Sequence, residues 1–123
     1  MAGRPLVAVV DDDESVRESL PDLLGVLGYD VQAFSSAEAF LASKSIAKTK
    51  SLVLDIAMPG MSGPDLVEEL TRLGHMIPVV FITAHRDAGL RTLDQGAVAC
   101  LFKPFSDTEL ADALETALKT SRE

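Results

Sequence analysis

The sequence predicts an α/β fold with a doubly wound, five-stranded parallel sheet, and the order of its apolar and amphipathic segments supports this prediction. Short apolar runs alternate with amphipathic stretches along all 123 residues, which is typical of repeated βα units. Right-handed crossovers between such units produce a doubly wound sheet. A length of 123 residues and an apolar share of 47% also suit one hydrophobic core, so we expect a single domain over residues 1–123.

Strands are expected where apolar residues follow one another without a polar face. Such runs fit parallel strands that are covered on both sides. The first and third runs end abruptly in acids. The five expected strands are Leu6–Val10, Asp30–Phe34, Ser51–Asp55, Pro78–Thr83 and Val98–Phe102.

Helices are expected between the strands and after the last one, where apolar residues recur at helical spacing. They cover about residues 14–27, 35–43, 64–73, 86–94 and 106–118. Pro21 should kink the first helix or weaken one of its turns, and Gly28 should end it. The fourth helix contains Gly89 and is only weakly apolar.

Three of these helices begin with recognisable signals. Ser35 with Glu38, and Ser106 with Glu109, match the capping-box pattern, in which a serine and an acid three residues later satisfy free backbone N–H groups. Pro64 suits the first position of the third helix, where no N–H donor is needed.

Composition excludes several classes of function. The formal charge of −8 argues against direct nucleic-acid binding, because phosphate neutralisation needs clustered Lys and Arg. Cys100 is the only cysteine, which excludes an intrachain disulfide and a Cys-rich zinc site. No apolar stretch reaches the roughly 18 residues that span a bilayer, and no signal-peptide pattern is present. We therefore expect a cytoplasmic protein without membrane contact.

Side chains that carry chemistry lie at or just after the carboxyl ends of four expected strands. They are Asp11, Asp12, Asp13, Asp55, Thr83 and Lys103. In a doubly wound sheet the binding site lies at this edge, where the strand order reverses. Carboxylates gathered in one crevice repel one another unless a cation lies between them. Oxygen ligands without His or Cys favour Mg²⁺.

Each of these residues has a simpler interpretation when taken alone. Acids after the first strand suit any solvated helix start, and their spacing does not match a calcium-binding loop. Asp55 could be a strand-end acid in a turn, Thr83 an ordinary β-branched strand residue and Lys103 a surface lysine. Their convergence at one edge of one sheet favours a functional site.

Four segments resemble the motifs of response-regulator receiver domains of two-component signalling, and the resemblance extends from about Leu6 to Leu118. The segments are Val9–Glu14, Leu54–Gly63, Ile82–Ala84 and Lys103–Phe105. The resemblance implies a flavodoxin-like (βα)5 fold with strand order 2-1-3-4-5. It also implies a phosphoacceptor that receives its phosphoryl group from a sensor histidine kinase or a phosphotransfer protein. Such a domain promotes only its own phosphorylation and dephosphorylation, and is not an enzyme with a separate substrate.

The resemblance assigns Asp55 as the nucleophile that becomes an acyl phosphate. It implies that Mg²⁺ is bound directly by Asp12 and Asp55, by the backbone carbonyl of Ala57, and by Asp11 through water. The ion would neutralise charge on the transferred phosphoryl oxygens. Asp13 is expected to be a helix-capping or surface acid instead of a ligand.

The resemblance also implies roles for the residues after the fourth and fifth strands. Lys103 and the hydroxyl of Thr83 would each contact a phosphoryl oxygen. Ala84 has a small side chain, which would let its backbone N–H approach the phosphoryl group. The Lys103–Pro104 peptide bond would be cis.

The switch region departs from the family pattern. Phosphorylation should draw Thr83 inward, yet Cys100 occupies the position of the family's switch aromatic, with Phe102 on the same strand face. We interpret Cys100 as a small, buried or half-buried hydrophobic residue in preference to a redox group. The segment before Lys103 is shorter than usual, so we expect a reshaped or mobile fourth helix to carry the switch.

Two positions that tune hydrolysis in the family are Ala57 and His85. Ala57 offers no side-chain group that could hold an attacking water, whereas His85 does. The simpler interpretation of His85 is an exposed loop residue.

Two other functions remain open from the sequence. A haloacid-dehalogenase-type phosphatase also uses a strand-end Asp with Mg²⁺, but it needs a second acid where Ala57 stands. A receiver-like interaction module that works without phosphorylation is the main alternative. The downstream partner is a target protein or an output domain that this chain lacks, and phosphorylation-dependent dimerisation is a further expectation.

Overall fold

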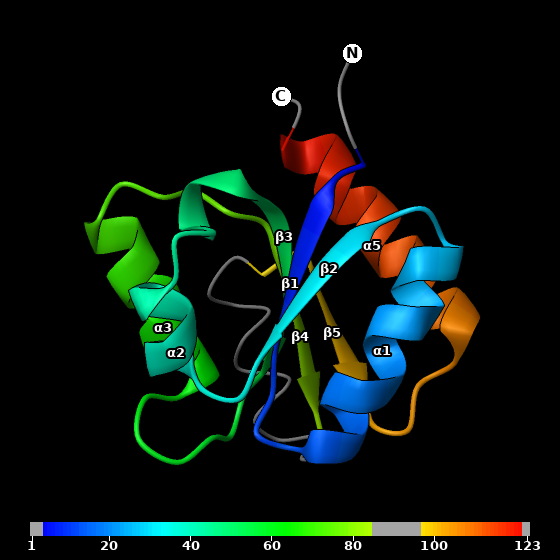
Figure 1. The fold of residues 1–123 in the computed structure, drawn as a ribbon, viewed down its shortest axis with the longest axis horizontal. Helices are drawn as coiled ribbons and strands as arrows, with labels where there is room; N and C mark the ends of the chain where they lie inside the picture. The colour runs from blue at the N-terminus through cyan, green and yellow to red at the C-terminus, as the bar shows by residue number, and fades with distance from the viewer. Residues whose placement is uncertain (1–3, 85–96, 122–123) are drawn as a thin grey trace.

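The computed structural model describes residues 4–84 and 97–121 and contains the predicted parallel sheet. Its strand order is β2-β1-β3-β4-β5 (Figure 1), and every neighbouring pair is parallel. The strands are β1 (Leu6–Val10), β2 (Asp30–Phe34), β3 (Thr49–Asp55), β4 (Val79–Thr83) and β5 (Ala99–Phe102). The predicted fold class and strand order are therefore confirmed.

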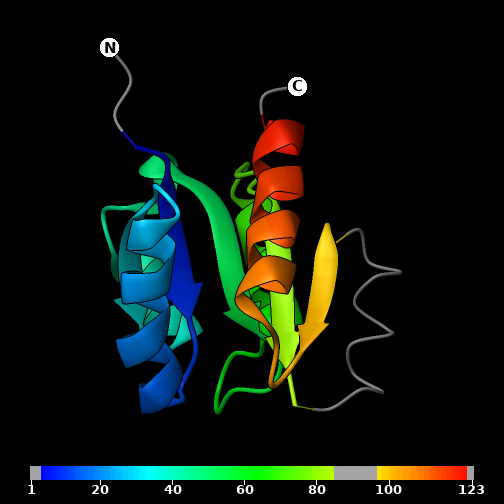
Figure 2. The same ribbon diagram turned by 90° about the vertical axis from the view of Figure 1, so that its right-hand side faces the viewer.

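Helices cover both faces of this sheet. They are α1 (Glu14–Val26), α2 (Ala37–Ala42), α3 (Gly63–Arg72) and α5 (Asp107–Ser121), with a short 3-10 helix η1 (Ile46–Lys48) before β3. α1 and α5 lie on one face, and α2 and α3 lie on the other (Figures 1 and 2). The helix expected over residues 86–94 lies outside the described residues. No helix in the described part of the chain has the length and apolar content needed to cross a membrane.

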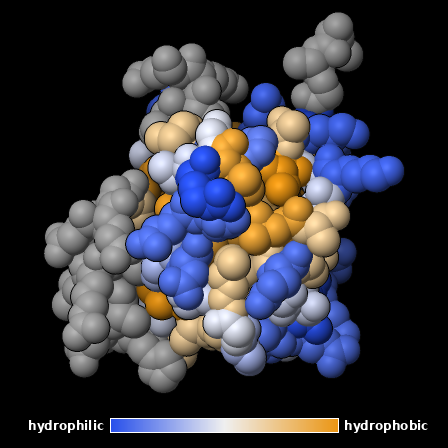
Figure 3. Space-filling view, turned by 90° about the vertical axis from the view of Figure 1, so that its left-hand side faces the viewer, coloured by the Kyte–Doolittle hydropathy of each residue, from blue (hydrophilic) through white to orange (hydrophobic). Residues whose placement is uncertain are grey.

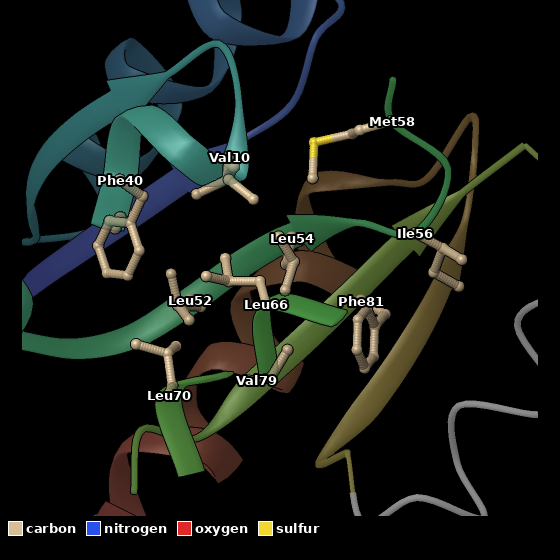
Figure 4. Close-up of a cluster of buried hydrophobic side chains, with 12 residues drawn as sticks. Val10, Phe40, Leu52, Leu54, Ile56, Met58, Leu66, Leu70, Val79 and Phe81 are labelled. Carbon is tan, nitrogen blue, oxygen red and sulfur yellow. The ribbon is translucent and has the colours of Figure 1, made fainter. Parts of the chain in front are cut away.

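Each face of the sheet has its own hydrophobic core. Alternate residues of β1 point to opposite faces, with Val7 and Val9 toward α1 and α5 and with Ala8 and Val10 toward α2 and α3. The second of these cores contains Phe40, Leu54, Leu66 and Phe81 among others (Figure 4). Because both faces are covered, the central strands are continuous apolar runs in the sequence. The surface over α2 and α3 mixes apolar and polar side chains (Figure 3).

The capping box predicted at Ser35 is wrong. The N-cap of α2 is Ser36, whose Oγ accepts the N–H of Ala39 at 3.0 Å. Glu38 does not return to the helix start, because its carboxylate accepts a hydrogen bond from the backbone N–H of Met61, in the loop after β3. The capping-box pattern favoured Ser35 because Glu38 stands three residues later, whereas Ser36 caps the helix without a reciprocal acid.

The other predicted helix signals agree more closely with the structure. The capping box of Ser106 and Glu109 is confirmed, since each residue's backbone N–H donates to the other's side-chain oxygen at 3.0 Å. Pro64 is the second residue of α3, not the first, because Ser62 caps the helix and Gly63 opens it. α1 is one continuous helix although it contains Pro21.

Candidate functional site

The two strands that meet at the topological switch point are β1 and β3. They lie side by side, with Val10 opposite Leu54, and α1 and α3 leave them on opposite faces of the sheet. Asp11 follows β1 and Asp55 ends β3. The fold therefore brings these two acids together at the edge where doubly wound sheets bind their ligands.

Three carboxylates meet at this edge. Asp11, Asp12 and Asp55 each offer an oxygen, and these oxygens lie within 4.8 Å of one another. Asp11 is 0% exposed and Asp55 is 6% exposed, whereas Asp12 is open to solvent. Ligands on opposite sides of Mg²⁺ are about 4.2 Å apart, since each bond is about 2.1 Å long. The donor set, which is all oxygen, fits this ion after small movements.

A cation from the chain itself already lies beside these acids. The ammonium of Lys103 donates to Asp11 Oδ2 at 2.9 Å and is 4.0 Å from Asp55 Oδ2. Burial opposes the charge of Lys103, but the hydrogen bond to Asp11 and the negative charges of Asp11 and Asp55 raise its pKa. The Lys103–Pro104 peptide bond is cis, as expected.

The protonation of Asp55 depends on its surroundings. Burial, together with the neighbouring Asp11 carboxylate, raises the pKa of Asp55 to about 7. Lys103 and a hydrogen bond from the Ala57 N–H act in the opposite direction. Asp55 is thus partly protonated near neutral pH without a metal ion, and a bound cation would favour the charged form.

Thr83 ends the neighbouring strand β4, and Ala84 follows it. Asp55 is paired with Ile82 in the β3–β4 register, so Thr83 lies one residue beyond the level of Asp55. Thr83 is fully buried, and its carbonyl accepts the N–H of Lys103 at 2.8 Å. Ala84 is exposed. The strand-end residues chosen from the sequence therefore converge on one edge of the sheet.

The structure describes most of the residues that were expected to switch or tune the site. Ala57 is exposed in the loop between β3 and α3. Cys100 is half-buried in β5 and packs against the core under α2 and α3, which agrees with its interpretation as a buried or half-buried hydrophobic residue. Phe102 is also half-buried. His85 lies outside the described residues.

The loop after β1 also has a structural acid. Asp13 is the N-cap of α1, since its Oδ1 accepts the N–H of Ser15 at 2.9 Å, as expected. The N–H of Asp13 donates to Asp11 Oδ1 at 2.9 Å. Both side-chain oxygens of Asp11 therefore accept hydrogen bonds, one from Asp13 and one from Lys103.

Two residues that support the site were missed in the sequence. Arg17 Nη1, on the first turn of α1, donates to the backbone oxygen of Asp11 at 2.9 Å. Glu38 Oε2 accepts the N–H of Met61 at 3.2 Å, in the loop after Asp55. No spacing rule predicts either contact, because both depend on how separate elements pack.

Comparison with known proteins identifies the family. The sequence profile of the response regulator receiver domain matches residues 7–115. The chain belongs to this family. It is a receiver domain of two-component signalling, and thus a signalling domain and not a conventional enzyme.

Similar receivers occur in several regulators. The chain is 45% identical to nodulation protein W of Bradyrhizobium diazoefficiens, over 97% of this chain and 53% of that protein. It is 40% identical to the response regulator protein TmoT of Ectopseudomonas mendocina, over 93% of this chain and 53% of that protein. The transcriptional regulatory protein FixJ of Rhizobium meliloti is 42% identical, over 90% of this chain and 55% of that protein. The chain thus spans about half the length of these curated relatives.

Solved structures show the same fold. The response regulator StyR superposes with a TM-score of 0.88 at 45% identity, covering 98% of this chain and 62% of that one. The structure described as FixJ-N superposes with a TM-score of 0.84 at 37% identity, covering 97% of this chain and 96% of that one.

Proposed function

We propose that this receiver accepts a phosphoryl group on Asp55 and passes the event on as a change of conformation. The observation that carries the proposal is the meeting of three carboxylates and one ammonium at the switch point, with Lys103 close to both Asp11 and Asp55. Such a constellation suits attack by a carboxylate on a phosphoryl group, because Lys103 and a cation held by the acids would offset the negative charge of that group.

In the proposed reaction, a carboxylate oxygen of Asp55 attacks the phosphorus of a phosphohistidine. The P–O bond forms as the P–N bond breaks, and the electron pair leaves with the imidazole, which takes up a proton. Asp55 must be ionised to attack, and its raised pKa means that it loses a proton first near neutral pH. The product is an acyl phosphate on Asp55.

The chain's own residues would prepare and hold this group. Asp11, Asp12, Asp55 and the carbonyl of Ala57 would hold Mg²⁺, which supplies positive charge to the phosphoryl oxygens. Lys103 would leave Asp11 and contact one phosphoryl oxygen, because its ammonium is already 4.0 Å from Asp55 Oδ2. We also assign contacts with the phosphoryl oxygens to the Thr83 hydroxyl and the Ala84 N–H.

The added charge would then shift the conformational equilibrium of the β4–β5 side of the domain. Thr83 would move toward the phosphoryl group, and the space behind it would be filled by rearrangement of the segment before Lys103, since Cys100 is too small to fill it. Amide exchange with and without a phosphoryl mimic tests this step. We expect altered exchange across residues 86–102, and identical exchange there would contradict it.

The donor would be a sensor histidine kinase or a phosphotransfer protein, which implies a cytoplasmic location. Downstream we infer a target protein, or an output domain such as the remainder of a transcriptional regulator, with dimerisation on phosphorylation as one route. Direct nucleic-acid binding by this domain is not part of the proposal, given its net charge of −8.

Intact mass tests the central claim. The chain is incubated with acetyl phosphate and Mg²⁺, and we expect a gain of one phosphoryl group that Asp55→Asn and metal chelation both abolish. Asp22→Asn, which changes an exposed acid on α1, is the matched control and should retain the gain. No gain for the unaltered chain would favour the phosphorylation-independent interaction module instead, and a gain that survives Asp55→Asn would contradict the assigned nucleophile.

A further inference from the structure

The loop between β3 and α3 is held at both of its ends. At its start, Ile56 N–H donates to the Ile82 carbonyl at 3.1 Å. At its end, Gly63 N–H donates back to the Ile56 carbonyl at 2.9 Å. Between these anchors lies Ala57, whose carbonyl is the proposed backbone ligand, and its orientation depends on the path of the loop.

Glu38 contacts the middle of this loop from another element. Its Oε2 accepts the N–H of Met61 at 3.2 Å. The same oxygen lies against Gly60, where an added Cβ would be only 2.7 Å from it. Gly60 has a φ of +75°, which disfavours other residues. The carboxylate therefore lies on the loop backbone at two successive residues.

The helix that carries Glu38 is firmly held. Ala37 and Phe40 of α2 are fully buried in the core under α2 and α3. Phe40 also packs edge-on against Phe34 of β2, with ring centroids 5.3 Å apart. Met58 of the loop belongs to the same core (Figure 4). Since the backbone of Glu38 is fixed in this way, its carboxylate can restrain the loop.

We propose that Glu38 is a positioning residue for the metal site, whose carboxylate holds the loop over residues 57–61 in the path that directs the Ala57 carbonyl toward the carboxylate cluster. The inference rests on the proposed function, because it assigns Ala57 as a ligand. Mg²⁺ demands near-octahedral geometry, so a carbonyl that moves away with a loosened loop is lost as a ligand. Groups that orient metal ligands commonly affect affinity even though they do not touch the metal.

Three variants test this inference. Glu38→Ala removes the acceptor, whereas Glu38→Gln removes the charge and keeps an oxygen that can accept from Met61. Glu68→Ala removes the charge of an exposed acid on α3 and serves as the control. Circular dichroism and thermal unfolding first establish that all three variants are folded.

The first measurement is amide exchange of Met61 in the metal-free protein. We expect Glu38→Ala to speed this exchange about tenfold, because the N–H loses its acceptor, and the other two variants to stay close to the unaltered chain. The second measurement is Mg²⁺ affinity by calorimetric titration. Glu38→Ala should weaken binding about 3- to 10-fold, and Glu38→Gln should restore it to within about twofold.

The outcomes separate the inference from the function on which it rests. Equal weakening by Glu38→Ala and Glu38→Gln would overturn the inference, since the charge of Glu38 and not its hydrogen bond would then matter. Unchanged Met61 exchange or unchanged affinity in Glu38→Ala would overturn it as well. If the unaltered chain binds no Mg²⁺, the proposed function fails, and this inference fails with it.

Discussion

The two sides of the functional edge differ in how firmly they are packed. We call the ends of β1 and β3, with Asp11, Asp12 and Asp55, the acceptor edge, and we call residues 99–102 the β5 edge. Six of the seven residues of β3 are buried, whereas all four residues of β5 are only half-buried. β3 is paired on both sides, with β1 and β4, while β5 follows β4 at the margin of the described sheet.

This difference bears on which edge would carry out the proposed phosphoryl transfer and which would change conformation in response. At the acceptor edge, hydrogen bonds from Arg17, Asp13 and Lys103 converge on Asp11, so the chain's own contacts fix the position of this acid. The β5 edge has less burial, and elements with less burial open at lower free-energy cost. The departure from the family pattern at Cys100 also lies there. We infer that the shape change belongs to the β5 edge and the chemistry to the acceptor edge.

The largest expected effect comes from breaking the packing of the acceptor edge. A Cβ at Gly63 would overlap the Asp55 carbonyl oxygen and lie 3.1 Å from the ring of Phe81. Gly63→Ala should therefore push α3 away from β3 and lower the free energy of unfolding by about 2–3 kcal/mol. Urea denaturation measures this change.

Gly25→Ala is the matched control for Gly63→Ala. Gly25 lies within α1, and an added Cβ there meets nothing within 4 Å. Because alanine favours a helix over glycine, this variant should gain about 0.5–1 kcal/mol. A Gly63→Ala variant as stable as the unaltered chain would contradict the close approach at the acceptor edge.

Removing the ammonium at the acceptor edge should separate metal binding from phosphorylation. In Lys103→Met, Mg²⁺ no longer competes with a cation that is 2.9 Å from Asp11, so affinity should rise about 3- to 10-fold. Phosphorylation by acetyl phosphate should slow about tenfold or more, because a stabilising charge is lost. Lys119→Met, at an exposed pair on α5, should change neither quantity, and a parallel fall of both in Lys103→Met would refute the competition.

The pH dependence of stability should reveal the buried acid. The folded-state pKa of Asp55, about 7, exceeds its usual value of 3.8. The stability that protonated Asp55 contributes is therefore fully present below about pH 4 and is lost as the pH rises through 7. Metal-free Asp55→Asn should match the unaltered chain at pH 4 and exceed it by about 1 kcal/mol at pH 8, allowing for solvent screening.

Thermal unfolding measures this difference, which corresponds to about 3–5 °C for a domain of this size. Mg²⁺ should remove it, because the ion favours ionised Asp55 and stabilises the unaltered chain. Asp22→Asn should show no such pH dependence. A constant difference between Asp55→Asn and the unaltered chain from pH 4 to 8 would argue against the raised pKa.

The smallest effect is expected at the β5 edge. Cys100→Val keeps a small apolar side chain in a half-buried position, so the free energy of unfolding should change by less than about 1 kcal/mol. Phosphorylation by acetyl phosphate should stay at its original rate. A large loss of that rate would show that the two edges are more closely coupled than their packing indicates.

Much of the site could be predicted because it follows from local rules. Apolar periodicity located the strands, and the strand-end rule of doubly wound sheets then selected Asp11, Asp55, Thr83 and Lys103. The same rules misplaced smaller features. β3 begins at Thr49 and not at Ser51, because Thr49 pairs with Leu6 of the neighbouring strand. The start of a strand depends on its neighbour, which the local pattern does not contain.

The fold class and the set of reactive side chains follow from the amino-acid sequence alone, because backbone period and strand ends are properties of short segments. The tertiary structure decided how those side chains are held. Lys103 donates a hydrogen bond to Asp11, 92 residues away in the sequence. Glu38 accepts a hydrogen bond from the loop after Asp55 and not from the start of its own helix. Both contacts depend on the positions of packed elements in space, and a hydrogen bond forms only within about 3 Å. No pattern along the chain specifies distances of that size.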